Sequence, residues 1–350
     1  MFEYKLFLIE GLYFELMKAP EDKEYLVKFL DGENVLYETV LKTGYWAKCN
    51  RRYLCNYFVE IWDGEVLMER ISFIDRLKGN KVFISFESKS LGDTIAWMHY
   101  CQVFKKTYQC KVVVSTFLNE LFENEYPELE FVGRGVVVHN IVAMLQIGWF
   151  WNKSMEPEHP VTIPLQKAAT NILYLPFTEV APRISYVYND RPIEQKYVAI
   201  STQSTSQLKL WDYWADLIEL LHKEGYAVYE VSKDDCNLDV IQPEDRSLQN
   251  VMNIIKHAEF YIGLSSGISW LAWALGADVV MISNFTNADH EFTDCTRIVD
   301  TSVCHGCWNN PKFKFDKGNW MWCPKHEDTK RQFECHKVIT AQHVFDKIKY

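Results

Sequence analysis

Four cysteines near the end of the chain have the spacing of a metal site. They are Cys304, Cys307, Cys323 and Cys335, in the pattern C-x2-C-x15-C-x11-C. Two thiolates at C-x2-C spacing can reach one ion from a tight turn, and a second pair completes a tetrahedron. Closed four-cysteine sites usually hold zinc, although four thiolates also suit iron. Such a site has no open coordination position, so the metal is predicted to be structural. Residues 301–350 are predicted to comprise this metal lobe and a C-terminal helix.

A short loop with the sequence Gly92-Asp93-Thr94 leads from a predicted strand into a predicted helix. A parallel α/β sheet presents functional groups at this position, and glycine lets another backbone approach closely. Asp93 could therefore act as a general base. It could equally be only the cap of the helix, which is worth about 1 kcal/mol of stability. The residues alone leave both roles open.

A second loop, residues 201–209, begins a second α/β pattern and carries five hydroxyl side chains before Lys209. Hydroxyls, backbone amides and a helix N-terminus bind phosphate, and a lysine adds a positive charge. The loop lacks the glycines of a P-loop. The alternative to a phosphate site is an ordinary solvated loop.

A third segment, Gly263-Leu264-Ser265-Ser266-Gly267, lies between a predicted strand and a predicted helix. It matches G-x-S-x-G, the nucleophile elbow of serine hydrolases, but the same turn could direct amides and hydroxyls at a diphosphate. In a hydrolase the chain order would place the catalytic histidine, His305, inside the cysteine lobe. A hydrolase would also leave the hydroxyl-rich loop unexplained.

Composition narrows the class of protein. At 350 residues and 48% hydrophobic, the chain is expected to form two or three globular domains. A net charge of −10 argues against a general nucleic-acid binder. Charged residues interrupt the first seventeen residues, which excludes a signal peptide, and no apolar run has the length of a membrane span. We therefore expect a soluble, cytoplasmic protein.

Two patterns of hydrophobicity divide the chain. Asp31-Gly32 and Asp63-Gly64 each stand between alternating runs, which predicts hairpins in an antiparallel, barrel-like β-domain over residues 1–76. Strands and helices then alternate, as in two Rossmann-like domains, 77–175 and 176–300, joined where six of the eleven prolines fall. Strands are expected at 81–86, 110–115, 197–201, 226–231, 260–263 and 278–282, and helices at 93–108, 119–126, 165–173, 211–223, 248–257 and 269–275.

The order of these motifs resembles that in a known family. Gly92-Asp93-Thr94, the loop ending in Lys209-x-Trp211, and the Ser266-Gly267 turn are similar to those of the ADP-heptose-using glycosyltransferases of the GT-B fold. With the β-domain and the four-cysteine lobe, the whole chain resembles the bacterial autotransporter heptosyltransferases, which carry an iron finger. The resemblance implies two Rossmann-like domains facing a cleft, and structural Fe(III) in place of zinc. It also implies that heptose moves from ADP-heptose to Ser or Thr hydroxyls with inversion.

The resemblance also implies roles for single residues. Asp93 matches the catalytic base, and Lys209 matches the lysine that neutralises the leaving diphosphate. The implied nucleotide-sugar ligands are Gly92, Thr94, Thr202, Ser204, Thr205, Lys209, Ser265, Ser266, Gly267, Phe285 and Thr286. Relatives outside this branch often carry Asp-Thr-Gly where this chain has Ser265-Ser266-Gly267. The chain has no Asp-x-Asp pair to bridge a diphosphate through Mg²⁺, so neither Mg²⁺ nor Mn²⁺ is expected.

The implied partners are a nucleotide-sugar donor, an acceptor protein with autotransporter adhesin passenger repeats, and further copies of the chain in a homo-oligomer. Neither a nucleic acid nor a membrane is expected as a partner. Three alternatives remain open at this point. They are a GT-B transferase with another nucleotide sugar or acceptor, a serine hydrolase built on Ser265, and a non-catalytic binding module.

Overall fold

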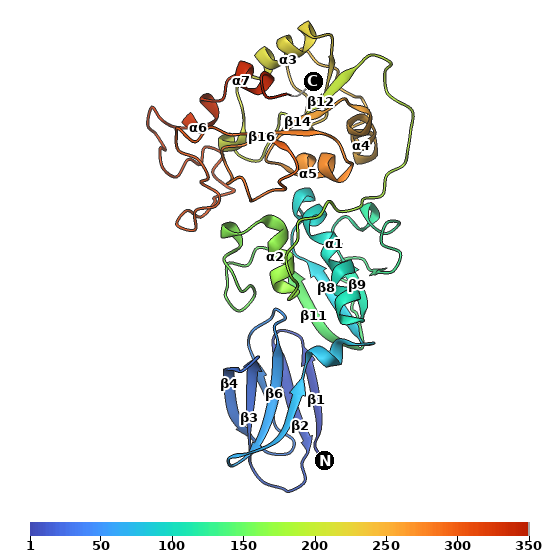
Figure 1. Ribbon diagram of the computed structural model, residues 1–350, viewed down its shortest axis with the longest axis vertical. Helices are drawn as coiled ribbons and strands as arrows, with labels where there is room; N and C mark the ends of the chain where they lie inside the picture. Colours follow the sequence, from blue (N-terminus) through green and yellow to red (C-terminus); the bar gives the residue numbers. More distant parts are fainter. Residues whose placement is uncertain (349–350) are drawn as a thin grey trace. The chain divides into compact units, whose positions relative to one another are not determined.

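Alternating apolar and polar residues in the N-terminal part of the chain form antiparallel strands in the computed structural model, which describes residues 1–348. One sheet has the strand order β4-β3-β6-β7 (Figure 1). Its strands are β3 (Tyr25–Asp31), β4 (Asn34–Leu41), β6 (Tyr57–Asp63) and β7 (Val66–Ser72). Gly32 and Gly64 lie at the two turns with φ of 60° and 57°, a conformation that glycine adopts at little cost. Both predicted hairpins are confirmed.

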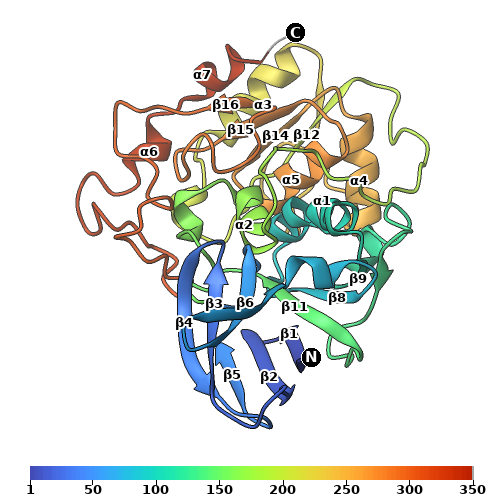
Figure 2. The same cartoon turned by 60° about the horizontal axis from the view of Figure 1, so that its bottom comes forward.

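A second sheet joins N-terminal strands to those of the first predicted α/β pattern (Figure 2). In sheet order its strands are β10 (Glu130–Phe131), β9 (Lys111–Ser115), β8 (Lys81–Phe86), β11 (Ile141–Ile147), β1 (Glu3–Leu8), β2 (Leu12–Lys18) and β5 (Trp46–Cys49). The strand β11, which the sequence analysis did not predict, pairs in parallel with both β8 and β1. The sheet thus continues across residue 76, and the division into domains 1–76, 77–175, 176–300 and 301–350 stays a prediction.

The helices of this part of the chain are α1 (Leu91–Tyr108) and α2 (Leu165–Ile172), with short 3-10 turns η1 (Ile74–Leu77), η2 (Asn119–Leu121) and η3 (Pro160–Thr162). The helix predicted at 119–126 is wrong, because only η2 forms there. The Asn119 side chain accepts hydrogen bonds from the Thr116 amide and hydroxyl, each at 2.9 Å, and donates to Val132 O. Side chains that bond the backbone in this way compete with helix formation.

The chain divides into two compact units. Unit 1 comprises residues 1–89, 97–160 and 166–178, and unit 2 comprises residues 90–96, 161–165 and 179–350. The first turn of α1, which holds Asp93, therefore belongs to unit 2 with the hydroxyl-rich loop, the Ser265 turn and the four cysteines.

Unit 2 is built on a five-stranded parallel sheet in the order β13-β12-β14-β15-β16. The strands are β12 (Tyr197–Ile200), β13 (Ala227–Glu230), β14 (Tyr261–Leu264), β15 (Val279–Ile282) and β16 (Thr296–Ile298). The helices are η4 (Gln207–Lys209), α3 (Trp214–Lys223), α4 (Leu248–His257), α5 (Gly267–Ala274), α6 (Glu334–Lys337) and α7 (Ala341–Phe345). The order of connection reverses between β12 and β14, and such a reversal is where open α/β sheets bind ligands.

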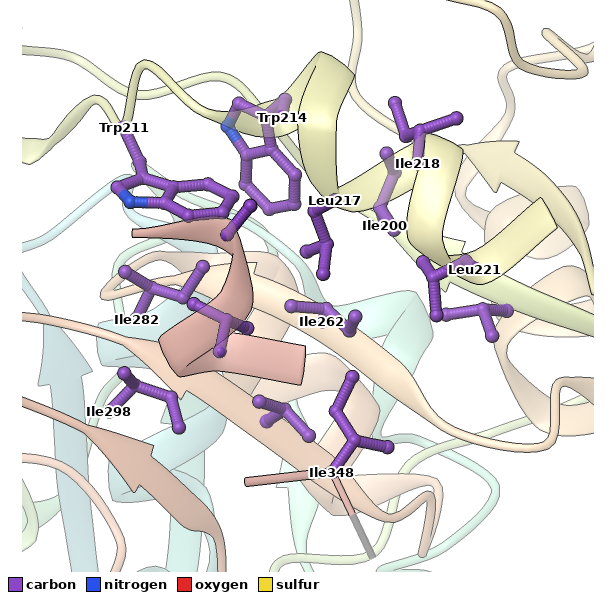
Figure 3. Close-up of a cluster of buried hydrophobic side chains, with 14 of the residues drawn as sticks. Ile200, Trp211, Trp214, Leu217, Ile218, Leu221, Ile262, Ile282, Ile298 and Ile348 are labelled. Atoms are coloured by element: carbon purple, nitrogen blue, oxygen red, sulfur yellow. The ribbon is translucent and has the colours of Figure 1, made fainter. Parts of the chain in front are cut away.

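Apolar residues on both sides of this sheet fix its position. Figure 3 shows Trp214, Leu217 and Leu221 of α3 directed toward Ile262 and Ile282 of the strands, and all five are buried. Strands buried in this way read as continuous apolar runs, which is why the sequence revealed them. Between residues 1 and 348, no helix combines the length and the apolar character that crossing a membrane requires.

Candidate active site and metal centre

Two loops meet at the point where the strand order reverses. The loop after β12 ends at Lys209, and the loop after β14 is Ser265-Ser266-Gly267. Because neighbouring parallel strands end at the same edge of a sheet, the two loops lie together. The Lys209 Nζ donates a hydrogen bond to Ser265 O at 3.4 Å. The structure therefore joins the two segments that the sequence analysis singled out separately.

A third segment reaches the same place through two glycines. A Cβ added to Gly92 would lie 3.0 Å from Trp270 Cδ1 and 3.3 Å from Gly267 Cα, and a Cβ on Gly267 would lie 3.0 Å from the Gly92 amide. Only glycines allow the first turns of α1 and α5 to pack this closely. Asp93, in the first turn of α1, is thereby held beside the first turn of α5.

The charged groups of these segments act on one another. Burial lowers the pKa of Lys209, while the negative charges of Glu291 and Asp93 act in the opposite direction. Burial likewise lowers the pKa of His290, against the charges of the same two carboxylates. Asp93, Lys209, His290 and Glu291 thus form one electrostatic cluster, in which an arriving anion would favour the charged form of Lys209 against the effect of burial.

Glu291, which the sequence analysis missed, is the centre of this cluster. It is 4% exposed, and it accepts hydrogen bonds from the Ser265 hydroxyl, from Thr286 Oγ1 at 2.9 Å and from Arg297 Nη2 at 2.9 Å. Burial alone would raise its pKa, but the charges of His290 and Arg297 and the two hydroxyl bonds outweigh burial and lower it. Its place in the loop after β15 was the one signal available, since strand ends carry functional groups.

Ser265 does not have the geometry of a nucleophile. Its hydroxyl has a single proton, which it donates to Glu291. Its φ is not positive, whereas a nucleophile elbow is a strained turn. Gly263 is required for packing, because a Cβ there would overlap the Tyr261 hydroxyl. The G-x-S-x-G pattern is therefore explained by close packing at both glycines.

Most hydroxyls near the site are already bonded within the protein. The Thr202 amide and hydroxyl both donate to Glu230 at 3.1 Å, and Ser206 Oγ accepts from the Leu208 amide. Thr94 Oγ1 donates to Ser90 O at 2.9 Å, inside the first turn of α1. By contrast, Ser204 is partly exposed and Thr205 is exposed.

The four cysteines of the lobe lie close together. Cys307, Cys323 and Cys335 are buried in one apolar cluster, and all four thiols are free of disulfides. Burial, and then the charges of the other three thiols, raise the pKa of Cys335 to about 12. Such mutual repulsion is what a bound cation would relieve, so the four residues fit a thiolate metal site.

Cys304 also belongs to another group of possible metal ligands. Atoms of Cys304, His326 and Glu334 lie within 4.8 Å of one another. However, the Glu334 carboxylate is already held by Arg331, whose Nε and Nη2 donate to it at 2.8 and 2.6 Å. Among residues 1–348 this is the group of such side chains whose ligand atoms come within 4.8 Å of one another, so a site formed by all four thiols stays a prediction.

Comparison with known proteins gives matches along the whole chain. Residues 176–321 match a sequence model of glycosyltransferase family 9 (heptosyltransferase). Autotransporter heptosyltransferase Aah of Escherichia coli is 33% identical, with 93% of this chain and 88% of that protein covered. Inactive autotransporter heptosyltransferase BimC of Burkholderia thailandensis is 31% identical, with 76% of this chain and 67% of that protein covered.

A solved structure is similar over nearly the same length. It is the dodecameric, iron-containing heptosyltransferase TibC in complex with ADP-D-β-D-heptose. The TM-score is 0.87 at 27% identity, and the match covers 98% of this chain and 94% of that one. The likeness includes the N-terminal strands and the four-cysteine lobe as well as the two α/β regions.

Proposed function

Since this chain belongs to the autotransporter heptosyltransferase family, we propose that it moves heptose from ADP-heptose to serine or threonine hydroxyls of an autotransporter protein. The predicted GT-B fold class and glycosyltransferase activity are confirmed by the family. The observation that carries the proposal is the junction of Lys209 with the Ser265 turn, where the strand order reverses. A lysine there can bind a diphosphate.

In the proposed reaction Asp93 takes the proton from the acceptor hydroxyl. The hydroxyl oxygen forms a bond to the anomeric carbon as the bond from that carbon to the ADP oxygen breaks on the opposite face, which inverts the configuration. Negative charge develops on the departing diphosphate, and the Lys209 ammonium neutralises it. Because an anion favours the charged form of a lysine, donor binding and protonation of Lys209 reinforce each other.

The donor would be held by few side chains and several backbone groups. Gly267 begins α5, whose first N–H groups have no partner within the helix, so Gly267 would offer its amide to the diphosphate, and Ser265 and Ser266 of the preceding turn would offer theirs. Ser204 and Thr205 would offer hydroxyls. The remaining candidates would shape the site without donating to the ligand, and these are Gly92, Thr94, Thr202, Phe285 and Thr286. We expect no need for Mg²⁺ or Mn²⁺, because Lys209 supplies the positive charge.

For the lobe we propose a structural metal held by the four cysteines Cys304, Cys307, Cys323 and Cys335. TibC contains iron, and we therefore favour Fe(III) over zinc. A metal with four protein ligands cross-links a segment that has little regular structure. We also propose that the chain forms a homo-oligomer, that it works in the cytoplasm, and that its acceptor carries autotransporter adhesin passenger repeats.

Membership of the family does not by itself establish activity, because the relative BimC is named inactive. The test therefore measures heptose transfer directly. Purified chain, ADP-heptose and an autotransporter passenger fragment are incubated, and the fragment is analysed by intact mass. We expect one or more heptose additions with the parent and none with Asp93→Asn, which should still bind ADP. If the parent neither modifies the fragment nor binds ADP, the proposed function is wrong.

A further inference from the structure

The loop after β15 is bonded to the four-cysteine lobe at several main-chain positions. Asn284 O accepts from the Gly306 amide at 2.8 Å, and Phe285 O accepts from the Trp308 amide at 3.1 Å. The side-chain amide of Asn284 also donates to Cys335 O. Gly306 and Trp308 flank the second cysteine of the C-x2-C pair, so this loop is attached to both halves of the metal site.

The loop that carries Lys209 is attached to the lobe as well. The Gln207 amide donates to Trp320 O at 3.0 Å. Leu208 is buried in the same apolar cluster as three of the lobe's cysteines. The residues on both sides of Leu208 therefore depend on the lobe for their position.

Phe285 is the residue that touches both regions. Its ring centroid is 4.7 Å from Lys209 Nζ, which is within the range of a cation–π contact. The same ring packs against the lobe, with centroids at 5.6 Å from Trp308, 5.8 Å from Phe315 and 6.3 Å from Trp322. It is 4% exposed, so it cannot move without disturbing either the lobe or the lysine.

We propose that Phe285 is a positioning residue that links the metal-bound lobe to Lys209, so that loss of the lobe's metal weakens binding of a nucleoside diphosphate. Between Thr301 and Phe333 the lobe has no helix or strand, so the metal is what would hold its aromatic residues in place. Without it Phe285 would lose its packing partners, and Lys209 would lose the ring that holds its ammonium. This inference rests on the proposed function, in which Lys209 binds the diphosphate.

A pair of matched variants tests the link. Phe285→Leu removes the ring beside Lys209, and Phe313→Leu removes a ring that packs against the same cluster but, within residues 1–348, makes no ring contact with Phe285 and no cation–π contact with Lys209. We expect the dissociation constant for ADP, measured by calorimetry, to rise about tenfold in Phe285→Leu, since Lys209 is half-buried and tenfold lies between the values of an exposed and a fully desolvated cation–π contact. In Phe313→Leu we expect this dissociation constant to stay within about twofold of the parent value.

The pH dependence of ADP affinity is a second measurement, and a general loss of packing in the lobe would not change it. The ring favours the charged ammonium, so in Phe285→Leu the affinity for ADP should begin to fall at a lower pH than in the parent. Phe313→Leu should keep the parent's pH profile. Equal ADP binding in both variants, whether both match the parent or both are weakened alike, would overturn the specific role of Phe285.

Removal of the metal completes the test. The full chain is treated with a chelator, its metal content is measured by emission spectroscopy, and folding is checked by circular dichroism before ADP is added. We expect weaker ADP binding that returns when iron is restored. Unchanged ADP affinity in the stripped, folded protein overturns the proposal. If stripping unfolds the chain, the two variants decide alone, and a parent that never binds ADP refutes the proposed function instead.

Discussion

Replacement of Glu291 by glutamine is the sharpest test of the hydrogen bonds that join Glu291 to Ser265, Thr286 and Arg297. Glutamine keeps the shape of the side chain and removes its charge. Arg297, whose side chain is 10% exposed, then loses its only ion-pair partner within residues 1–348, and its Nη1 is already buried without a hydrogen bond. Removing one member of a buried ion pair costs about 3–5 kcal/mol, and a surface pair about 0–1 kcal/mol. We expect Glu291→Gln to lower the stability of unit 2 by about 3 kcal/mol, the lower end of this range, because the glutamine amide oxygen can still accept a hydrogen bond.

The pH dependence of this loss has a defined sign. The pKa of Glu291 is lowered in the folded protein, so its contribution is fully present above the unfolded pKa of about 4.3. The contribution disappears as the pH falls through the lower, folded pKa. The difference in stability between parent and Glu291→Gln should therefore be constant near neutral pH and shrink only in acid.

The assay must report on unit 2 alone, because the chain has two compact units. Hydrogen exchange of peptides from β14 to β16, followed by mass spectrometry in increasing urea, gives that local free energy. Glu179→Gln is the control. Glu179 accepts hydrogen bonds from the Thr293 amide and hydroxyl, in the same loop as Glu291, but it is only half-buried, so the substitution should lower stability by less than about 1 kcal/mol. If Glu291→Gln costs no more than Glu179→Gln, the reasoning about the buried network is refuted. Arg297→Met in the Glu291→Gln background should restore part of the loss.

Three further outcomes are expected. As the pH rises, the affinity of the parent for ADP should begin to fall before the ordinary lysine pKa of about 10.4 is reached, because the pKa of Lys209 is lowered; Lys209→Arg should remove this decline, and an identical decline in both would contradict it. Gly263→Ala should destabilise unit 2 by at least about 2 kcal/mol in urea, since its Cβ would overlap the Tyr261 hydroxyl; Gly225→Ala, at an open position with positive φ, should cost about 1 kcal/mol. Burial raises the pKa of Glu156 to about 7, above the unfolded value of about 4.3, so its ionisation costs more stability as the pH rises between these two values; Glu156→Gln should therefore raise thermal stability clearly more at pH 8 than at pH 4, and equal effects at both would count against it.

The sequence predicted those elements whose signals are local. The Asp-Gly hairpins depend on two residues at each turn, and the unit 2 strands are apolar runs buried on both faces. β11 is one of the strands that were not predicted, and its partners β8 and β1 lie far from it in the chain. The wrong helix at 119–126 failed because one side chain, Asn119, bonds a distant carbonyl. Non-local pairing of this kind leaves no pattern in a short window.

The site divides in the same way. The loops around Asp93, Lys209 and Ser265 were predicted, since each stands at the junction of a strand and a helix. Glu291 was not predicted, because a carboxylate reads as a surface residue until its burial and its partners are known. The lobe was expected to be an appendage, yet its backbone forms hydrogen bonds with Gln207, in the loop that carries Lys209, and with Phe285, in the loop after β15. The local sequence thus indicates the residues that would contact a substrate better than it indicates the buried groups, such as Glu291, that hold those residues in position.

The hydroxyl-rich loop shows why a count of polar residues overstates a binding site. Each hydroxyl has one proton, and those of Ser265 and Thr202 are donated to buried carboxylates. A diphosphate would therefore meet few free hydroxyls, the amides at the start of α5 and one lysine. Amide dipoles and a single charge bind any nucleoside diphosphate in much the same way. In the proposed function, selectivity for the sugar and the base would then come from other contacts, and the diphosphate site would supply affinity and charge for the departing group.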